Sequence, residues 1–122
     1  MLEVILRTQT GVRALSSVLS ETESLHAPHL IDLEVVQVLR QYLRTGIIDK
    51  RRATEALEDF SSFPIQRYAH DLFLVRIWEL RRNLTAYDAS YVALAEALDA
   101  KLLTCDKALA KSTGHRANVV LL

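Results

Sequence analysis

Residues 86–106 read AYDASYVALAEALDAKLLTCD, and they are the most informative segment for the fold class of the chain. Thr85 precedes it as a capping residue, and the apolar side chains that follow recur at helical spacing, which predicts a helix over residues 86–100. The short apolar run 101–104 comes directly after this helix and predicts a buried strand. A helix followed at once by a short buried strand is typical of a parallel sheet covered by helices.

The rest of the chain shows the same alternation. Apolar residues recur at helical spacing up to Gly46, a residue type common just past helix ends, and Asp49 can cap the helix that follows. Further helices are predicted over residues 28–45, 50–60 and 70–82, the last with Trp78 in its core, and further strands over residues 25–27, 64–68 and 119–122. We therefore expect one α/β domain over residues 1–122, with a short parallel sheet buried on both faces.

The composition excludes several classes of protein. Fifteen basic residues balance fifteen acidic ones, so the chain of 122 residues is no polycationic nucleic-acid coat. Half of the residues are apolar, yet no apolar run approaches the roughly 20 residues of a membrane helix, and the N-terminus lacks the pattern of a signal peptide. The single cysteine, Cys105, is predicted to be buried beside a strand and fits a reducing compartment. We expect a cytoplasmic protein.

Eleven of the fifteen basic residues are arginine, whose planar guanidinium suits phosphate recognition. They include two groups along the sequence, Arg40, Arg44, Arg51 and Arg52 in one and Arg76, Arg81 and Arg82 in the other. Either group could contact a nucleic-acid backbone. The alternative, and the commoner role for any one of them, is a local ion pair on a solvated helix face.

Three acidic residues are candidates for a functional site. Glu34 borders the buried stripe of the first predicted helix, Asp88 starts the helix after Thr85, and Asp106 directly follows the strand 101–104. Ligands of open parallel sheets bind outside the carboxyl ends of the strands, where Asp106 would lie. Small residues beyond Asp88 on its helix face would leave space for a metal and a substrate. Three carboxylates in one pocket would suit Mg²⁺ or Mn²⁺.

Each acid also has a purely structural explanation. Glu34 could pair with an arginine at the edge of the core, because a buried carboxylate needs a partner. Asp88 could belong to a near-match of a capping box, and Asp106 could cap a helix over residues 107–111. Asp32, on the same helix as Glu34, could cap or flank that helix without joining any site.

Three segments resemble successive motifs of the PIN family, and most closely those of its VapC toxins. They are LIDLEVV at residues 30–36, AYDASYVALAE at residues 86–96 and LTCDKAL at residues 103–109. Tyr-Asp-Ala followed by Tyr-x-Ala-Leu-Ala-Glu is the most specific of them, and their order and spacing match along essentially the whole chain. The resemblance implies the three-layer α/β/α sandwich of that family, with a short central parallel sheet.

The resemblance also implies a function. Glu34 would match the helix glutamate of the family, Asp88 its central metal-binding aspartate and Asp106 its late acid, with Thr104 as a polar neighbour that supports this acid. Such proteins are similar to one another in being metal-dependent endoribonucleases that commonly form homodimers. We therefore expect Mg²⁺ or Mn²⁺ as the cofactor, RNA as the substrate and a VapB-like antitoxin as the partner, with no role for a membrane.

The beginning of the chain departs from the family pattern. Family members usually open with a strand ending in Val-Asp-Ala-Ser, followed by a helix similar to residues 2–8. We therefore expect residues 2–8 to form that helix, so that the central strand and its metal-binding aspartate have no counterpart. Glu3 would be no substitute, because it would fall on the helix. Either the start site is set too far downstream or the chain is a truncated copy.

Functions from different classes remain open. The first is a metal-dependent endoribonuclease toxin that hydrolyses RNA with carboxylate-bound Mg²⁺ or Mn²⁺. The alternative is a catalytically impaired PIN remnant that acts only as an antitoxin-binding or dimerisation module. A purely structural helical protein without a pocket is the third.

Overall fold

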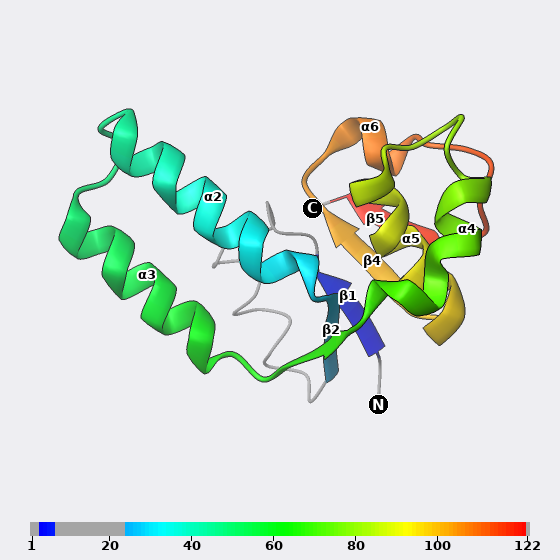
Figure 1. The fold of residues 1–122 in the computed structure, drawn as a ribbon, viewed down its shortest axis with the longest axis horizontal. Coiled ribbons are helices and arrows are strands. Elements are labelled where there is room, and N and C mark those ends of the chain that lie inside the picture. The colour runs from blue at the N-terminus through cyan, green and yellow to red at the C-terminus, as the bar shows by residue number, and fades with distance from the viewer. Residues whose placement is uncertain (1–2, 7–23, 122) are drawn as a thin grey trace.

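The computed structural model of the protein describes residues 3–6 and 24–121. Over these ranges five short strands form one parallel sheet in the order β3-β2-β1-β4-β5 (Figure 1). The strands are β1 (Glu3–Leu6), β2 (Ser24–Pro28), β3 (Ile65–Tyr68), β4 (Lys101–Thr104) and β5 (Asn118–Leu121). The helices are α2 (Leu30–Arg44), α3 (Lys50–Ser62), the 3₁₀ helix η1 (His70–Phe73), α4 (Leu74–Glu79), α5 (Ala86–Leu98) and α6 (Lys107–Ala110). No helix in the described ranges is long and apolar enough to cross a membrane.

The centre of the sheet is where the sequence prediction was wrong. Glu3–Leu6 belongs to no helix but forms strand β1, which lies between β2 and β4. Val4 is level with Leu25 of β2, and Ile5 is level with Leu102 of β4. The three apolar residues Val4 to Leu6 do not reveal by their periodicity whether they are helical or extended, and here the backbone groups of two neighbouring strands pair with this segment. The central position is therefore occupied, while residues 2, 7 and 8 lie outside the described ranges.

Strands β2 and β4 have buried residues on both faces of the sheet, as the sequence predicted. Neighbouring residues of a strand point to opposite faces, so Leu102 packs in one apolar cluster and Leu103 in the other. The first cluster lies between the sheet and α4 and α5, with the fully buried Tyr91 in it. The second includes Ile31 at the start of α2, with Phe60 near the end of α3 packed against it. The α/β fold is confirmed, with helical residues against each face.

Most other predicted elements are found within a few residues of their predicted bounds. Gly46 follows α2 with a φ of 78°, a left-handed conformation that favours glycine. Asp49 caps α3, accepting a hydrogen bond from the backbone N–H of Arg52 at 2.8 Å. Cys105, in contrast, is exposed rather than buried, because it follows the last residue of β4, where the chain turns out toward α6.

The predicted helix over residues 70–82 is divided into η1 and α4 and ends at Glu79. Phe73, Ile77 and Leu80 pack in the first apolar cluster at a spacing of four and three residues. Trp78 directly follows Ile77, so it lies outside the buried face formed by these three residues, and it is 66% exposed. The prediction that Trp78 belongs to the core is therefore wrong.

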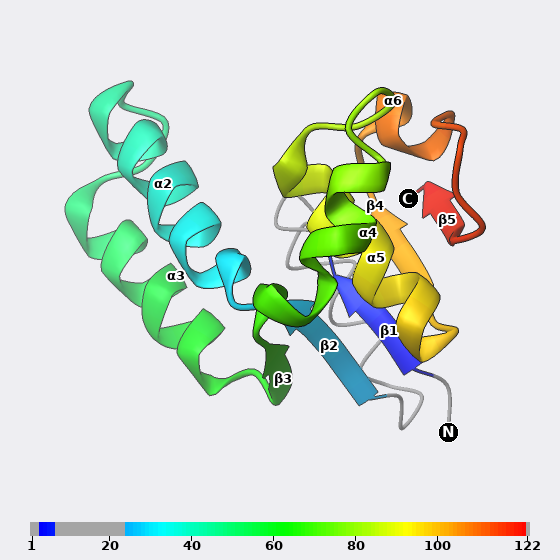
Figure 2. The same ribbon diagram turned by 45° about the vertical axis from the view of Figure 1, so that its right-hand side comes forward.

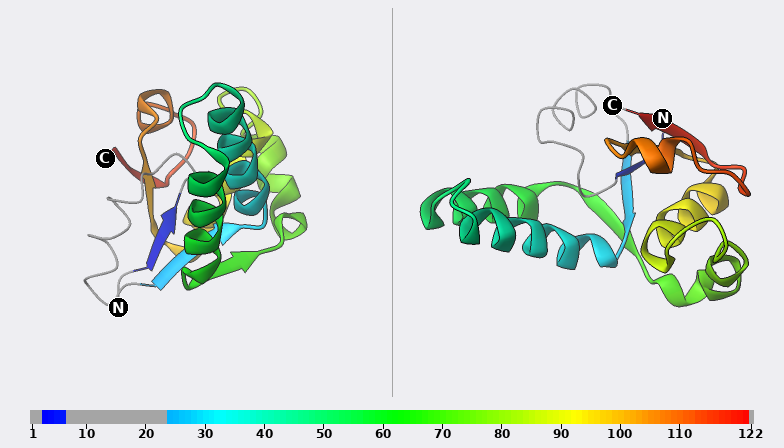
Figure 3. Two further views of the ribbon diagram at one scale, coloured as in Figure 1. Left: turned by 90° about the vertical axis from the view of Figure 1, so that its left-hand side faces the viewer. Right: turned by 90° about the horizontal axis from the view of Figure 1, so that it is seen from above.

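Most of the exposed large apolar side chains among the described residues lie in two regions. The helices α2 and α3 form a hairpin that extends away from the sheet (Figures 1 and 3), and η1 and α4 lie on the other side of the molecule (Figure 3). The exposed residues of the hairpin and its turn are Leu33, Val36, Tyr42, Leu43, Ile47 and Leu57. Those of η1 and α4, called the α4 surface below, are Leu72, Leu74, Val75 and Trp78.

Candidate active site

The three candidate acids come from three elements that meet at the carboxyl edge of the sheet. The strands are parallel, so their carboxyl ends lie at one edge; α2 starts directly after β2, and α6 directly after β4 (Figure 2). Helix α5 leads into the start of β4, so its own first turn lies toward the opposite, carboxyl end of that strand. Glu34 in α2, Asp88 in α5 and Asp106 before α6 therefore share this edge.

Glu34 is held by a contact between two helices. The hydroxyl of Tyr91 in α5 donates a hydrogen bond to Oε1 of Glu34 in α2, with an oxygen–oxygen distance of 2.5 Å. Tyr91 is fully buried, and Glu34 is half-buried, as the sequence predicted for the edge of the apolar stripe. The partner expected from the sequence was an arginine. The tyrosine was missed because a contact across 57 residues leaves no local signal.

Asp88 lies in the first turn of α5. Thr85 caps this helix, since its hydroxyl oxygen accepts a hydrogen bond from the backbone N–H of Asp88 at 3.2 Å. The negative charge of Asp88 also suits the positive end of the helix dipole. The small residues beyond it do not leave the space that the sequence suggested, because Val92 and Ala95 are packed in the apolar core.

Asp106 has the capping role that was considered from the sequence. Its Oδ1 accepts hydrogen bonds from the backbone N–H groups of Ala108 at 2.8 Å and Leu109 at 3.3 Å. The fully buried Thr104 accepts a hydrogen bond from the backbone N–H of Asp106 at 3.0 Å through its hydroxyl oxygen. Thr104 therefore fixes the backbone of the residue that caps α6, and its support of Asp106 in a metal site stays a prediction.

These two roles of Asp106 can be separated by substitution. Asparagine caps a helix about as well as aspartate, so Asp106→Asn is expected to keep the free energy of unfolding within about 0.5 kcal/mol, whereas Asp106→Ala is expected to lose about 1 kcal/mol. Urea unfolding followed by circular dichroism measures both. Asp49→Ala, at the cap of α3, is the matched control for loss of a cap elsewhere. Equal stability of the Ala variant and the wild type would show that the cap is dispensable.

The donor chemistry of this edge fits a hard cation, but the described residues do not form a closed metal site. Carboxylate oxygens are the ligands that Mg²⁺ and Mn²⁺ prefer, and Mg²⁺ is often held by one or two carboxylates with several waters. Within residues 3–6 and 24–121, no three His, Cys, Asp or Glu side chains are grouped closely enough to hold a metal ion. The described part of β1 adds no acid there, because Glu3 begins the strand and therefore lies at the amino edge. The convergence of all three acids on one ion stays a prediction.

Asp32 takes no part in this arrangement. Arg67 of β3 holds it in a salt bridge, with Nε 2.9 Å from Oδ1 and 2.8 Å from Oδ2. The structure thus separates the two acids of α2 that the sequence placed side by side. Asp32 joins its helix to β3, and Glu34 contacts α5.

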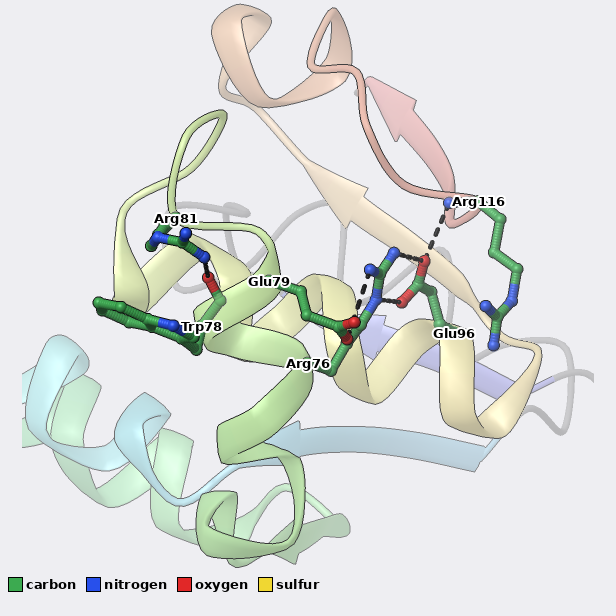
Figure 4. Close-up of polar contacts among 6 residues, drawn as sticks. All are labelled: Arg76, Trp78, Glu79, Arg81, Glu96 and Arg116. Carbon is green, nitrogen blue, oxygen red and sulfur yellow. Dashed lines mark hydrogen bonds and ion pairs between the residues drawn. The ribbon is translucent and has the colours of Figure 1, made fainter.

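Several arginines that could have contacted nucleic acid form ion pairs instead. Arg51 and Arg52 pair with Glu55 on the exposed side of α3. Arg76 pairs with Glu96 and more loosely with Glu79 (Figure 4). For these three arginines the local ion pair is the observed role. The side chain of another, Arg81, lies over the ring of Trp78, 4.4 Å from its centroid.

The ion pair of Arg76 and Glu96 is held by several hydrogen bonds. Two hydrogen bonds join the side chains, from Nε to Oε1 at 2.7 Å and from Nη2 to Oε2 at 2.9 Å, and the backbone N–H of Arg116 donates to Oε2 at 2.9 Å (Figure 4). The side chain of Glu96 is only 2% exposed. The hydrogen bond from Arg76, supported by that from Arg116, lowers the pKa of Glu96 to about 2 against the opposing effect of burial. This glutamate, the last residue of the quoted Tyr-x-Ala-Leu-Ala-Glu segment, therefore joins α4 and α5 to the segment before β5.

Several known proteins are similar to this chain in sequence or in fold. The PIN-domain family model matches residues 1–114. Ribonuclease VapC12 of Mycobacterium tuberculosis is 36% identical over 120 residues, which span 98% of this chain and 92% of that protein. Ribonuclease VapC9 of the same organism is 48% identical over 87 residues, 69% of this chain and 66% of that protein. The crystal structure of PAE2754 from Pyrobaculum aerophilum superposes with a TM-score of 0.66 at 27% identity, over 89% of this chain and 84% of that one. The chain belongs to the PIN-domain family and is a homologue of its VapC ribonucleases.

Proposed function

We propose that the protein is a cytoplasmic endoribonuclease toxin of the VapC type, which hydrolyses phosphodiester bonds of RNA with Mg²⁺ or Mn²⁺ and is held inactive by a VapB-like antitoxin. The observation that carries the proposal is the placement of Glu34, Asp88 and Asp106 at one edge of the sheet in a homologue of VapC ribonucleases. Single-stranded RNA suits this edge best, because its backbone is open to a site made of side chains from several elements.

The three acids and Thr104 would have different roles in binding the metal. Glu34, Asp88 and Asp106 would supply the oxygen ligands, and Thr104 would keep the backbone of Asp106 in place. A bound divalent cation would lower the pKa of a water molecule and neutralise charge on the scissile phosphate. Carboxylates gathered without a cation would repel one another, which is why the proposal ties all three to a metal.

The test is cleavage of single-stranded RNA by the purified chain in Mg²⁺ or Mn²⁺, with and without excess EDTA. We expect cleavage with either metal, none in EDTA, and restoration when the metal is added back. Cleavage that continues at full rate in EDTA would contradict the metal mechanism. The Asp88→Asn variant, purified in the same way as the wild type, is the control for contaminating nucleases.

One observation favours the alternative, a catalytically impaired PIN remnant that only binds an antitoxin or dimerises. The described part of β1 brings no acid to the carboxyl edge, although β1 is the central strand. Under this alternative the wild-type chain would cleave no RNA at any metal concentration and would still bind the antitoxin. Binding of a co-expressed VapB-like protein, measured beside the cleavage assay, separates the two functions.

We also propose that the α4 surface pairs with a second copy of this chain. Its four apolar residues are more than half exposed, and exposed apolar patches commonly mark interfaces. Exposed Glu79 and Arg81 border Trp78 with charges of both signs, which suits the self-complementary contact of a twofold dimer. The aromatic ring and the arginine over it are of the kind that dominates binding energy at interfaces.

Substitution of Trp78 tests this pairing. Trp78→Ser is expected to raise the dissociation constant of the dimer about 30-fold or more, the change typical of a central interface tryptophan. Analytical ultracentrifugation over a range of concentrations measures it. Tyr42→Ser, at an exposed aromatic of the α2–α3 hairpin, is the control and should leave the dimer unchanged. A wild-type chain that stays monomeric would contradict the pairing. Loss of the dimer in the Tyr42 variant alone would show that the dimer interface lies on the α2–α3 hairpin instead.

A further inference from the structure

Tyr91 occupies a position that packing alone does not explain. Residues 89–95 of α5 are all buried, and most of them are small or aliphatic. Tyr91 is the largest of the fully buried side chains, and its hydroxyl reaches from α5 to Glu34 in α2. Phenylalanine would fill the same volume without a buried hydroxyl, whose desolvation is costly unless a partner is present. The polar end of this side chain is accounted for by its contact with the carboxylate of Glu34.

The contact links two of the three candidate acids. Tyr91 follows Asp88 by three residues in the same helix, and residues three apart lie on the same side of a helix. Its hydroxyl donates to Oε1 of Glu34, and a hydrogen bond to the end of a long, half-buried side chain restricts its rotamers. Tyr91 therefore ties the carboxylate of Glu34 to the helix that carries Asp88.

We propose that Tyr91 is a positioning residue, which holds the carboxylate of Glu34 in the orientation that the acidic site requires. The inference rests on the proposed metal-dependent cleavage of RNA and names a residue that acts through Glu34 without touching the substrate. Residues that orient a metal ligand commonly change metal affinity or activity by about 10- to 100-fold when their hydrogen bond is removed.

The variant Tyr91→Phe removes one oxygen atom and keeps the ring. Tyr68→Phe is the matched control, because the hydroxyl of Tyr68 also makes a partly buried hydrogen bond, to Nδ1 of His26 at 2.7 Å. Both variants are expected to lower the melting temperature by a few degrees. Only Tyr91→Phe is expected to weaken Mn²⁺ binding about 10- to 100-fold, measured by electron paramagnetic resonance on the protein without RNA.

Cleavage kinetics give the second measurement. Tyr91→Phe is expected to lower kcat about tenfold or more with KM for RNA nearly unchanged, since the substrate contacts remain. Added to Glu34→Gln, the same change is expected to cause little further loss of Mn²⁺ binding, because its effect passes through that carboxylate. Additive losses in the double variant would overturn the positioning role.

The outcomes separate this inference from the proposed function. A wild-type chain that binds Mn²⁺ and cleaves RNA, with Tyr91→Phe equal to Tyr68→Phe in both measurements, overturns the inference and leaves the function standing. A wild-type chain that neither binds Mn²⁺ nor cleaves RNA overturns the function, and with it the role of Tyr91. Selective loss of Mn²⁺ affinity and kcat in Tyr91→Phe supports both.

Discussion

The Glu96→Gln variant is expected to lose about 3 kcal/mol of unfolding free energy at pH 7, equivalent to a melting temperature lower by roughly 10 °C. Glutamine keeps the size of the side chain, and its oxygen can still accept from the backbone N–H of Arg116. The substitution removes the negative charge of the carboxylate to which Arg76 donates two short hydrogen bonds. The guanidinium of Arg76, whose side chain is only 31% exposed, then has no opposite charge at this contact. Breaking a buried pair by removing one partner is costly because the other charge stays behind.

Glu79→Gln provides the matched control. It removes the other carboxylate near Arg76, but Glu79 is 58% exposed and its Oε1 lies 3.8 Å from Nη1 of Arg76. An exposed pair of this kind is worth about 0.2 to 1 kcal/mol, so this variant should melt close to the wild type. Similar melting temperatures for the two Gln variants would contradict the dominant role of Glu96.

The same pair predicts how stability depends on pH. The pKa of Glu96 falls from 4.5 to about 2 on folding, so the unfolded chain binds the proton more readily. The stabilisation is therefore fully present above about pH 4.5 and is lost as the pH falls toward 2. We expect the difference in unfolding free energy between wild type and Glu96→Gln to shrink over this window in urea titrations. A difference that stays constant down to pH 2 would contradict the lowered pKa.

Asp88→Asn is expected to reduce RNA cleavage in Mg²⁺ by at least about a hundredfold, since a lost ligand charge is worth several kcal/mol at a metal site. Asparagine keeps the shape of the side chain, and Thr85 still caps α5 because that hydrogen bond uses the backbone N–H of residue 88. The fold should therefore survive, with a small loss from the missing charge at the start of the helix.

Initial rates with and without Mg²⁺ measure the effect, with circular dichroism as the check on folding. Asp59→Asn, at an exposed position of α3, makes the same chemical change away from the proposed site and should keep the wild-type rate. Full activity of Asp88→Asn would remove this aspartate from the mechanism. Equal losses in both variants would point to a general effect of charge on RNA binding.

The sequence predicted those features that depend on neighbouring residues. Thr85 before α5 and Asp106 before α6 are local capping signals, and both caps are present in the structure. The apolar run of β4 follows its helix at once and could be read without knowledge of the rest of the chain. The rule for parallel sheets predicted the position of Asp106 at the carboxyl edge, and the convergence of Glu34, Asp88 and Asp106 on one metal stays a prediction.

The features that were not predicted depend on residues that lie far apart in the sequence. Val4 and Ile5 are extended because β2 and β4 lie on either side of them, and a run of three apolar residues carries no sign of those neighbours. The contact between Tyr91 and Glu34 joins two helices that are far apart in the sequence. Trp78 was assigned to the core because of its apolar character, but the stripe that is buried runs through Ile77 and Leu80.

The central position of β1 in the sheet limits the order in which a newly made chain can fold. Val4 pairs with Lys101, so the centre of the sheet joins two segments from nearly opposite ends of the sequence. Before β4 leaves the ribosome, the α2–α3 hairpin and the pairing of β2 with β3 can form, but β4 and Asp106 are not yet available. The edge that carries Asp106 is therefore assembled only after β4 has emerged and paired with β1. On the proposed function, a nascent chain would be harmless to the ribosome and messenger that produce it until that strand has emerged.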